Sequence, residues 1–240
     1  MAKKLEAYPG NAKQSSVDSA GLRKKILTRF LAAPIVLGLF LFVPAGTLDY
    51  WQAWVYCAVL FIPMFFLIAY FLKKDPKVLE RRIKMKEKEN RQKSLVMLSG
   101  VVFFIGILLP GLDRRFGWST VPFEIAIAAD IVIFLGYLLF FLVLRENHYA
   151  SRVIEIQKGQ KVISTGPYSV VRHPMYVAVL LIWLFTPIAL GSYLALIPFL
   201  SLPLVLFFRI LNEEDVLRRE LPGYAEYCQK TKYRLVPFVW

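Results

Sequence analysis

Two short polar motifs interrupt the mainly apolar sequence of 240 residues. The first, at 164–176, reads STGPYSVVRHPMY, and the second, at 209–215, reads RILNEED. In the first motif, Pro174 restricts His173 to an extended conformation and suits the first position of a helix. The free N–H groups and the positive dipole end of that helix favour an anionic group, for example a carboxylate.

The second motif places a basic and an acidic side chain on one helix face. Arg209 and Glu213 are four residues apart, the spacing of an ordinary ion pair on a helix surface. Glu214 and Asp215 follow directly, and a single arginine cannot pair with all three acids. The motif follows a long apolar run of the membrane-spanning type. At the cytoplasmic edge of a membrane helix, lysine and arginine collect and acids are not favoured. The pattern therefore predicts a binding site that uses the acids.

Apolar helices must position both motifs. Six apolar runs predict membrane helices, of which the last two are short or tilted: 30–44, 53–72, 95–112, 123–144, 176–190 and 193–211. Only Gly191 and Ser192 separate the last two runs, which predicts a tight helical hairpin. A hairpin returns the chain to the side from which it started. The two polar motifs are therefore expected to face one pocket.

Composition and charge place the chain in a membrane. A hydrophobic fraction of 57% is too high for most soluble domains, and the formal net charge is +13. Segments 1–29, 73–94, 145–175 and 209–240 hold 28 of the 30 lysines and arginines. Because basic residues collect in cytoplasmic loops, we expect both termini and the pocket to face the cytoplasm. The basic surplus then needs no nucleic-acid partner.

The predicted fold class is an all-α, polytopic membrane bundle of about six helices. It divides into a flexible basic tail at 1–25, a four-span membrane region at 26–144 and a C-terminal region at 145–240 that carries both motifs. The predicted location is a bacterial inner membrane or the endoplasmic reticulum. The sequence indicates no oligomeric state.

Several other classes of site are excluded. The chain lacks a G-x-G-x-x-G motif, a phosphate-binding loop and H-E-x-x-H. Two cysteines and two histidines are too few for a four-cysteine zinc site or a histidine-rich di-iron site, so no metal site is predicted.

The aromatic and basic tail after Leu217 is typical of a segment in the lipid headgroup layer, with a lid over the pocket as the alternative. Arg172 by itself is interpreted as a headgroup contact.

The motifs together resemble the isoprenylcysteine carboxyl methyltransferase family, which is related to phospholipid methyltransferases. The resemblance covers 145–240: G-P-Y-x-x-x-R-H-P-x-Y, an apolar hairpin, E-E, and P-G-Y-x-x-Y followed by R-L-x-P. Ala178 departs mildly from the family pattern, in which this small residue is often glycine.

The resemblance implies S-adenosylmethionine as cofactor, bound between the R-H-P loop and the acids. It implies cofactor contacts for Tyr168, His173, Pro174, Tyr176, Glu213 and Glu214, and also for Gln160, Val162 and Ile163 in a strand-like approach to Gly166. It links Arg209 with the carboxyl group of the substrate, so that Arg209 and Glu213 are the expected catalytic residues.

The expected activity is methyl transfer to a lipid-like acceptor in the bilayer, such as the carboxylate of a prenylated cysteine or an analogue. Three alternatives stay open. Methylation of a phospholipid amine would leave Arg209 without a carboxylate to bind. An NADPH-dependent reductase of the sterol type is disfavoured because adjacent acids repel a phosphorylated nucleotide. A transporter or scaffold would leave the facing motifs unexplained.

Overall fold

Long apolar helices dominate the part of the chain that the computed structural model describes, which is residues 19–83, 90–151, 156–157 and 159–240. These helices are α1 (Ser19–Ala45), α2 (Trp51–Lys74), α3 (Pro76–Ile83), α4 (Asn90–Phe116), α5 (Phe123–Glu146), α6 (Pro174–Ala189), α7 (Leu196–Phe199), α8 (Leu202–Glu220) and α9 (Tyr224–Lys230), with the 3-10 turn η1 (Gly166–Ser169). No strand occurs among the described residues, and the approach to Gly166 is irregular.

The predicted all-α polytopic bundle is confirmed. Five segments are long and apolar enough to cross a membrane: α1 from Ile26, α2, α4 from Val96, α5, and the segment that contains α7 and α8. The sixth apolar helix, α6, has only 16 residues, or ~24 Å at ~1.5 Å per residue. Apolar side chains face outward along the bundle, and those of Ile35, Phe66, Met97 and Leu204 are each more than 60% exposed. A lipid environment would cover them.

Three helix boundaries differ from those that the apolar runs predict. Helix α1 begins at Ser19, inside the predicted tail, of which residues 1–18 lie outside the described residues. The basic segment after α2 contains the short helix α3. Helix α8 continues beyond the apolar run to Glu220, so the acids of the second motif lie on a helix. Hydropathy marks only the part of a helix that suits hydrocarbon, whereas helical hydrogen bonding continues into polar sequence.

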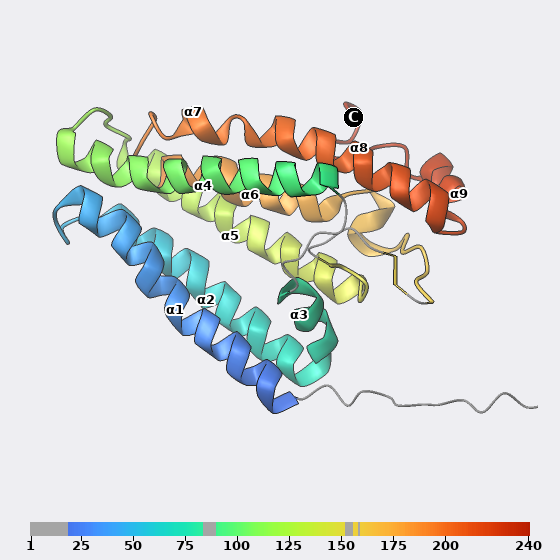
Figure 1. Ribbon diagram of the computed structural model, residues 1–240. Helices are drawn as coiled ribbons and strands as arrows, with labels where there is room; N and C mark the ends of the chain where they lie inside the picture. Colours follow the sequence, from blue (N-terminus) through green and yellow to red (C-terminus); the bar gives the residue numbers. More distant parts are fainter. Residues whose placement is uncertain (1–18, 84–89, 152–155, 158) are drawn as a thin grey trace, which may run out of the picture.

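Helix α5 runs diagonally between α2 and α6 and packs against both (Figure 1). Its contact with α6 is close because Gly136 has no side chain. A Cβ atom at this position would lie 2.9 Å from Cγ1 of Ile182. Gly111 has the same effect between α4 and α1, where a Cβ atom would lie 2.5 Å from the carbonyl oxygen of Leu41. Small residues let membrane helices approach closely in this way.

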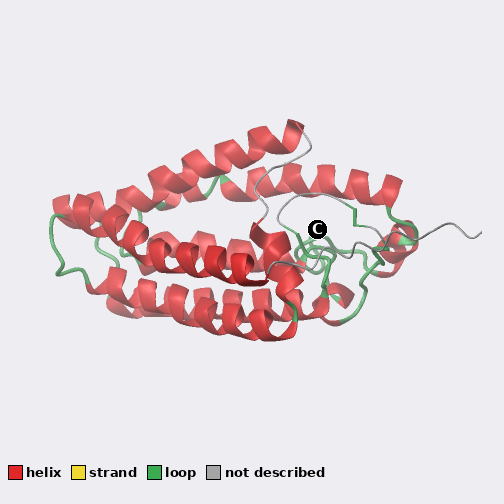
Figure 2. Ribbon diagram, turned by 60° about the horizontal axis from the view of Figure 1, so that its bottom comes forward, coloured by secondary structure: helices red, strands yellow, loops and turns green. Residues whose placement is uncertain are grey.

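The chain turns back after α6 at Gly191, as the sequence predicts. Gly191 has a φ of +77°, a left-handed conformation that glycine adopts without strain. The buried carboxylate of Asp113 in α4 accepts hydrogen bonds from the hydroxyl groups of Ser192 and Ser119, which hold the turn. The returning arm is not one helix, because α7 ends at Phe199 and α8 begins at Leu202. Loops gather near the C-terminus at the other end of the bundle (Figure 2).

Candidate functional site

A cavity of about 650 Å³ lies among α4, α6, α8, α9 and the loops before η1. Eight of the predicted site residues line it: Gln160, Val162, Ile163, Tyr168, His173, Tyr176, Arg209 and Glu213. The hairpin therefore brings the two polar motifs to one cavity. Pro174 and Glu214 are not among the described residues that form its wall.

The R-H-P loop is buried and tied to the C-terminal tail. Gly166 begins η1 with a φ of +55°, and Pro174 begins α6 as predicted. The backbone N–H of Arg172 donates to the carbonyl of Tyr233 at 2.9 Å, and that of His173 donates to the carbonyl of Arg234 at 2.9 Å. These bonds fix the loop, so that His173 is held at the cavity wall with its side chain 5% exposed.

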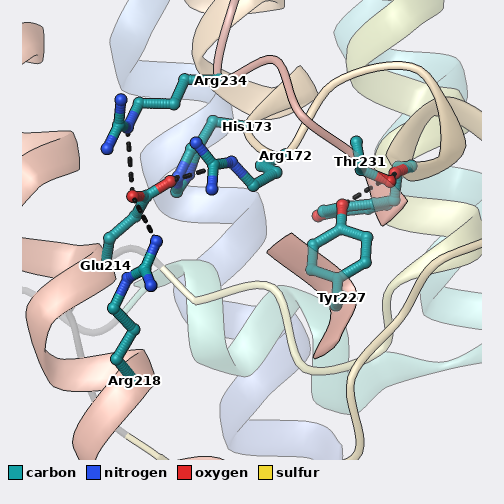
Figure 3. Close-up of polar contacts among 8 residues, drawn as sticks. Arg172, His173, Glu214, Arg218, Tyr227, Thr231 and Arg234 are labelled. Carbon is teal, nitrogen blue, oxygen red and sulfur yellow. Dashed lines mark hydrogen bonds and ion pairs between the residues drawn. The ribbon is translucent and has the colours of Figure 1, made fainter. Parts of the chain in front are cut away.

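Glu214 is the centre of a buried ionic cluster (Figure 3). Its side chain is only 3% exposed. One carboxylate oxygen, Oε1, lies 3.1 Å from Nε of Arg172 and 3.2 Å from Nε2 of His173. The other, Oε2, accepts a hydrogen bond from Nε of Arg234 at 3.0 Å and lies 3.8 Å from a guanidinium nitrogen of Arg218. Glu214 thus joins the R-H-P loop, α8 and the tail, and its carboxylate already has several partners.

A second cluster of polar side chains, formed by Arg209, Tyr176 and Glu213, connects α6 to α8 at the cavity wall. Nε of Arg209 donates a hydrogen bond to the hydroxyl of Tyr176 at 3.0 Å, and this hydroxyl donates to Oε2 of Glu213. Tyr176 therefore links the two side chains that the sequence places on one helix face. Among these residues, Glu213 presents a carboxylate and Arg209 a guanidinium to the same cavity. That pairing suits a ligand with both positive and negative groups.

Three tyrosines outside the apolar helices border the cavity. The amide of Asn147 donates to the hydroxyl of Tyr168 at 2.9 Å, and the hydroxyl of Tyr227 donates to the carbonyl of Tyr168 at 2.7 Å. Burial raises the pKa of Tyr227 to about 12, and it raises the pKa values of Tyr168 and Tyr224 further above their usual range. All three phenols therefore stay neutral near pH 7 and keep a proton that can be donated, which Tyr227 donates to the carbonyl of Tyr168.

The sequence interpretation missed the apolar part of the cavity wall. Phe103, Leu180, Trp183, Leu202, Val205 and Leu206 line it, from three different helices. The rings of Phe103 and Trp183 pack edge to face, with their centroids 4.6 Å apart. Both side chains also pack against the buried core that contains Phe199. Hydropathy alone could not distinguish these side chains from others in the same apolar helices.

Two interpretations of basic and aromatic residues change. Arg172 is not a headgroup contact, because it is 7% exposed and pairs with Glu214. In the tail, Tyr224 and Tyr227 are buried and line the cavity, whereas Phe238 and Val239 are about 80% exposed or more. The start of the tail therefore forms part of the wall, and only its end matches the surface position expected for the whole segment.

In the described part of the chain, no group of three or more His, Cys, Asp or Glu side chains is placed to hold a metal ion.

One protein-family model matches part of the chain. Residues 126–219 match the model of the isoprenylcysteine carboxyl methyltransferase (ICMT) family. The matched segment runs from α5 into α8 and contains the R-H-P loop, the hairpin and both glutamates. The resemblance predicted from the sequence is thereby confirmed for this segment, and the P-G-Y motif of the tail lies beyond it. No curated protein matches the chain.

The Glu214 cluster predicts a large loss of stability for Glu214→Gln. The substitution leaves buried Arg172 without its carboxylate, and breaking a buried ion pair in this way costs about 3–5 kcal/mol. Thermal unfolding of the purified full chain measures the effect. Asp215→Asn is the control, since Asp215 and its partner Arg219 are both more than 60% exposed and such pairs contribute about 0–1 kcal/mol. Equal stability of the two variants would contradict the central role of Glu214.

Proposed function

We propose that this chain is an integral membrane methyltransferase that uses S-adenosylmethionine and methylates the carboxylate of a lipid-like acceptor. A prenylated cysteine or an analogue fits best. One observation carries the proposal: a single cavity joins an ionic end, with Arg209, Tyr176 and Glu213, to an apolar branch that ends at Phe103 and Trp183. The family match over 126–219 supports methyl transfer.

The ionic end offers suitable groups for the cofactor. Glu213 lines the cavity and can accept hydrogen bonds from the ammonium group of the cofactor's methionine part. His173 and the N-terminus of α6 adjoin the same space and favour its carboxylate. We propose that Glu214 acts indirectly, by holding Arg172, His173 and the tail in place, because its own carboxylate is occupied by these partners.

Arg209 suits the carboxylate of the acceptor. Its planar guanidinium can bind both oxygens of a carboxylate, and its contact with Tyr176 orients it. The cofactor, when bound, supplies a methyl group that is already activated on a sulfonium. The acceptor carboxylate is deprotonated near pH 7, so no side chain has to remove a proton. The protein then needs to align two reactants and exclude water.

The apolar branch suits the tail of the acceptor. Tyr176 and Trp183 are seven residues apart on α6, and Leu202 and Arg209 are seven apart on α8. Seven residues of α-helix rise ~10 Å at ~1.5 Å per residue, so the distance along each helix gives the apolar branch a depth of ~10 Å. C–C bonds of ~1.5 Å advance an extended chain by about 1.25 Å per carbon, so this depth corresponds to about eight chain atoms. Burying such a tail in the protein explains why the site lies among membrane helices.

We further propose that the site faces the cytoplasm. Arg82 of α3 and Arg209 of α8 line the cavity, so the basic residues of these two helices belong to the same end of the bundle. The positive-inside rule then favours a cytoplasmic position for that end. S-adenosylmethionine is a charged, water-soluble molecule, which agrees with a site at the aqueous edge of the bilayer.

Labelling of membranes tests the function directly. Membranes that contain the full chain are incubated with methyl-labelled S-adenosylmethionine, and the labelled lipid and peptide fractions are separated. We expect label that mild base releases, because a methyl ester is base-labile whereas an N-methyl group is not. Base-stable label in phospholipid would instead support methylation of a lipid amine, and the absence of label above that of membranes lacking the chain would reject the methyltransferase assignment.

Glu213→Gln is expected to weaken cofactor binding. A hydrogen bond to a charged group contributes about 1.5–3 kcal/mol, so affinity for S-adenosylhomocysteine should fall by ~10- to 100-fold. Isothermal titration calorimetry of the purified chain measures this. Asp215→Asn removes an exposed acid two residues away and should bind like the wild type. Unchanged affinity in Glu213→Gln would place the ammonium group elsewhere.

Arg209→Ala is expected to impair methylation more than cofactor binding. Removing one partner of a buried charge pair costs about 2–5 kcal/mol, so kcat/KM for a carboxylate acceptor should fall by ~30-fold or more. Arg209→Lys keeps the charge but loses the planar fork, and intermediate activity is expected. Arg219→Ala, on the exposed face of α8, serves as control. Loss of S-adenosylhomocysteine binding in parallel with turnover would argue against acceptor recognition by Arg209.

Trp183→Ala is expected to change the preferred length of the acceptor tail. The substitution removes the indole at the end of the apolar branch, so longer tails gain buried surface. Each additional buried methylene should raise kcat/KM by ~4-fold in the variant. A series of S-alkyl N-acetylcysteines measures the profile, with Phe134→Ala on the outer face of α5 as control. An identical profile in wild type and Trp183→Ala would show that the tail leaves the cavity elsewhere.

A further inference from the structure

Tyr224 has a buried hydroxyl group without a hydrogen-bond partner. The residue is 4% exposed and lines the same cavity as Glu213 and Arg209. No atom of the described residues forms a hydrogen bond with its hydroxyl oxygen. Buried hydroxyl groups in proteins are nearly always paired, and leaving one unpaired costs about 1–3 kcal/mol.

Tyr227 shows what a purely structural tyrosine looks like in this cluster. The two rings lie 5.8 Å apart on α9, and both residues are about 95% buried. The hydroxyl of Tyr227 donates to the carbonyl of Tyr168 at 2.7 Å, so that it links α9 to η1. Tyr224 makes no comparable link through its hydroxyl. Its ring supplies packing, which a phenylalanine would supply equally well.

The surroundings of Tyr224 indicate which ligand group would pair with it. Tyr224 belongs to an apolar cluster with Leu221, Tyr227, Leu217, Val162 and Ile156, and the same side chains line the cavity. Aliphatic and aromatic side chains beside an unpaired hydroxyl group suit a flat heteroaromatic ring, which offers a large apolar face and a few ring nitrogens as acceptors. Burial is the main cause of the raised pKa of Tyr224, and the charges of Glu214, Glu213 and Arg172 also act on its phenol, so the ionic groups lie beside this apolar wall.

We propose that the Tyr224 hydroxyl donates a hydrogen bond to the adenine ring of the bound cofactor. This inference rests on the proposed function, because it takes S-adenosylmethionine as the ligand. The proposed hydrogen bond would make α9 part of the cofactor site. Helix α9 lies beyond the segment that matches the methyltransferase family. Tyr224 is then a binding residue and not only a packing residue of the tail.

The proposal predicts that stability and binding change in opposite directions. Tyr224→Phe removes a hydroxyl that has no partner in the free protein, so the unfolding temperature should stay equal or rise. Affinity for the cofactor should fall by ~5-fold, the loss expected for one neutral hydrogen bond. Tyr227→Phe should lower the unfolding temperature, because it removes the bond to Tyr168.

The experiment uses the purified full chain with two ligands. S-adenosylhomocysteine contains the adenosine and amino-acid parts, whereas 5′-methylthioadenosine lacks the amino-acid part. Calorimetric titration of wild type and Tyr224→Phe with both ligands, together with thermal unfolding of the free proteins, gives all the required values. We expect the same ~5-fold loss for both ligands, since both carry adenine.

Three results would overturn the inference while leaving the proposed function intact. These are equal affinity of Tyr224→Phe and wild type, a loss with S-adenosylhomocysteine but not with 5′-methylthioadenosine, or a fall in unfolding temperature as large as that of Tyr227→Phe. If the wild type binds neither ligand, the proposed function itself fails and the inference falls with it. The two failures are therefore distinguishable.

Discussion

The ion pairs of Glu214 hold the candidate site together. This carboxylate lies within 3.2 Å of nitrogen atoms from Arg172, His173 and Arg234, which belong to the R-H-P loop and the C-terminal tail. A buried charge is costly unless it is paired, so none of these segments can move away without leaving an unpaired charge behind. The cavity wall depends on this cluster, because the loop, α8 and the tail all contribute to it.

The two adjacent glutamates have different environments. Successive side chains on a helix point about 100° apart, so Glu213 and Glu214 face different directions from α8. Glu213 faces the cavity and accepts a hydrogen bond from Tyr176. Glu214 faces the loop and the tail. One acid of the pair therefore borders the cavity, whereas the other pairs with the loop and the tail.

Membrane embedding and chemistry are connected through the hairpin. Asp113 and Gly191 hold the turn at one end of the bundle, and α6 and α8 border the cavity toward the other end. The two helices carry polar side chains where they leave the apolar region and apolar side chains deeper in the bundle. An amphipathic acceptor has the same division between a charged head and an apolar tail. The proposed acceptor would therefore match the site in both parts.

Several features followed from local sequence because their physical causes are local. Long apolar runs specify membrane helices, a Gly-Ser pair between two runs specifies a reversal, and Pro174 begins a helix. Spacing placed Arg209 and Glu213 on one helix face, the family resemblance added Tyr176, and the hairpin then required that the two motifs meet. The length of α8 was underestimated because hydropathy ends where the polar residues begin, although the helix does not.

The partners of Arg172 and the wall formed by Phe103, Trp183 and Tyr224 were decided only by the tertiary structure. Each depends on contacts between segments that are distant in the chain, and the same residue types in another packing would face lipid or water. The sequence by itself determined that this is a membrane helix bundle with two facing polar motifs. Side-chain packing determined which acid meets the cavity, because burial and pairing are properties of neighbours in space.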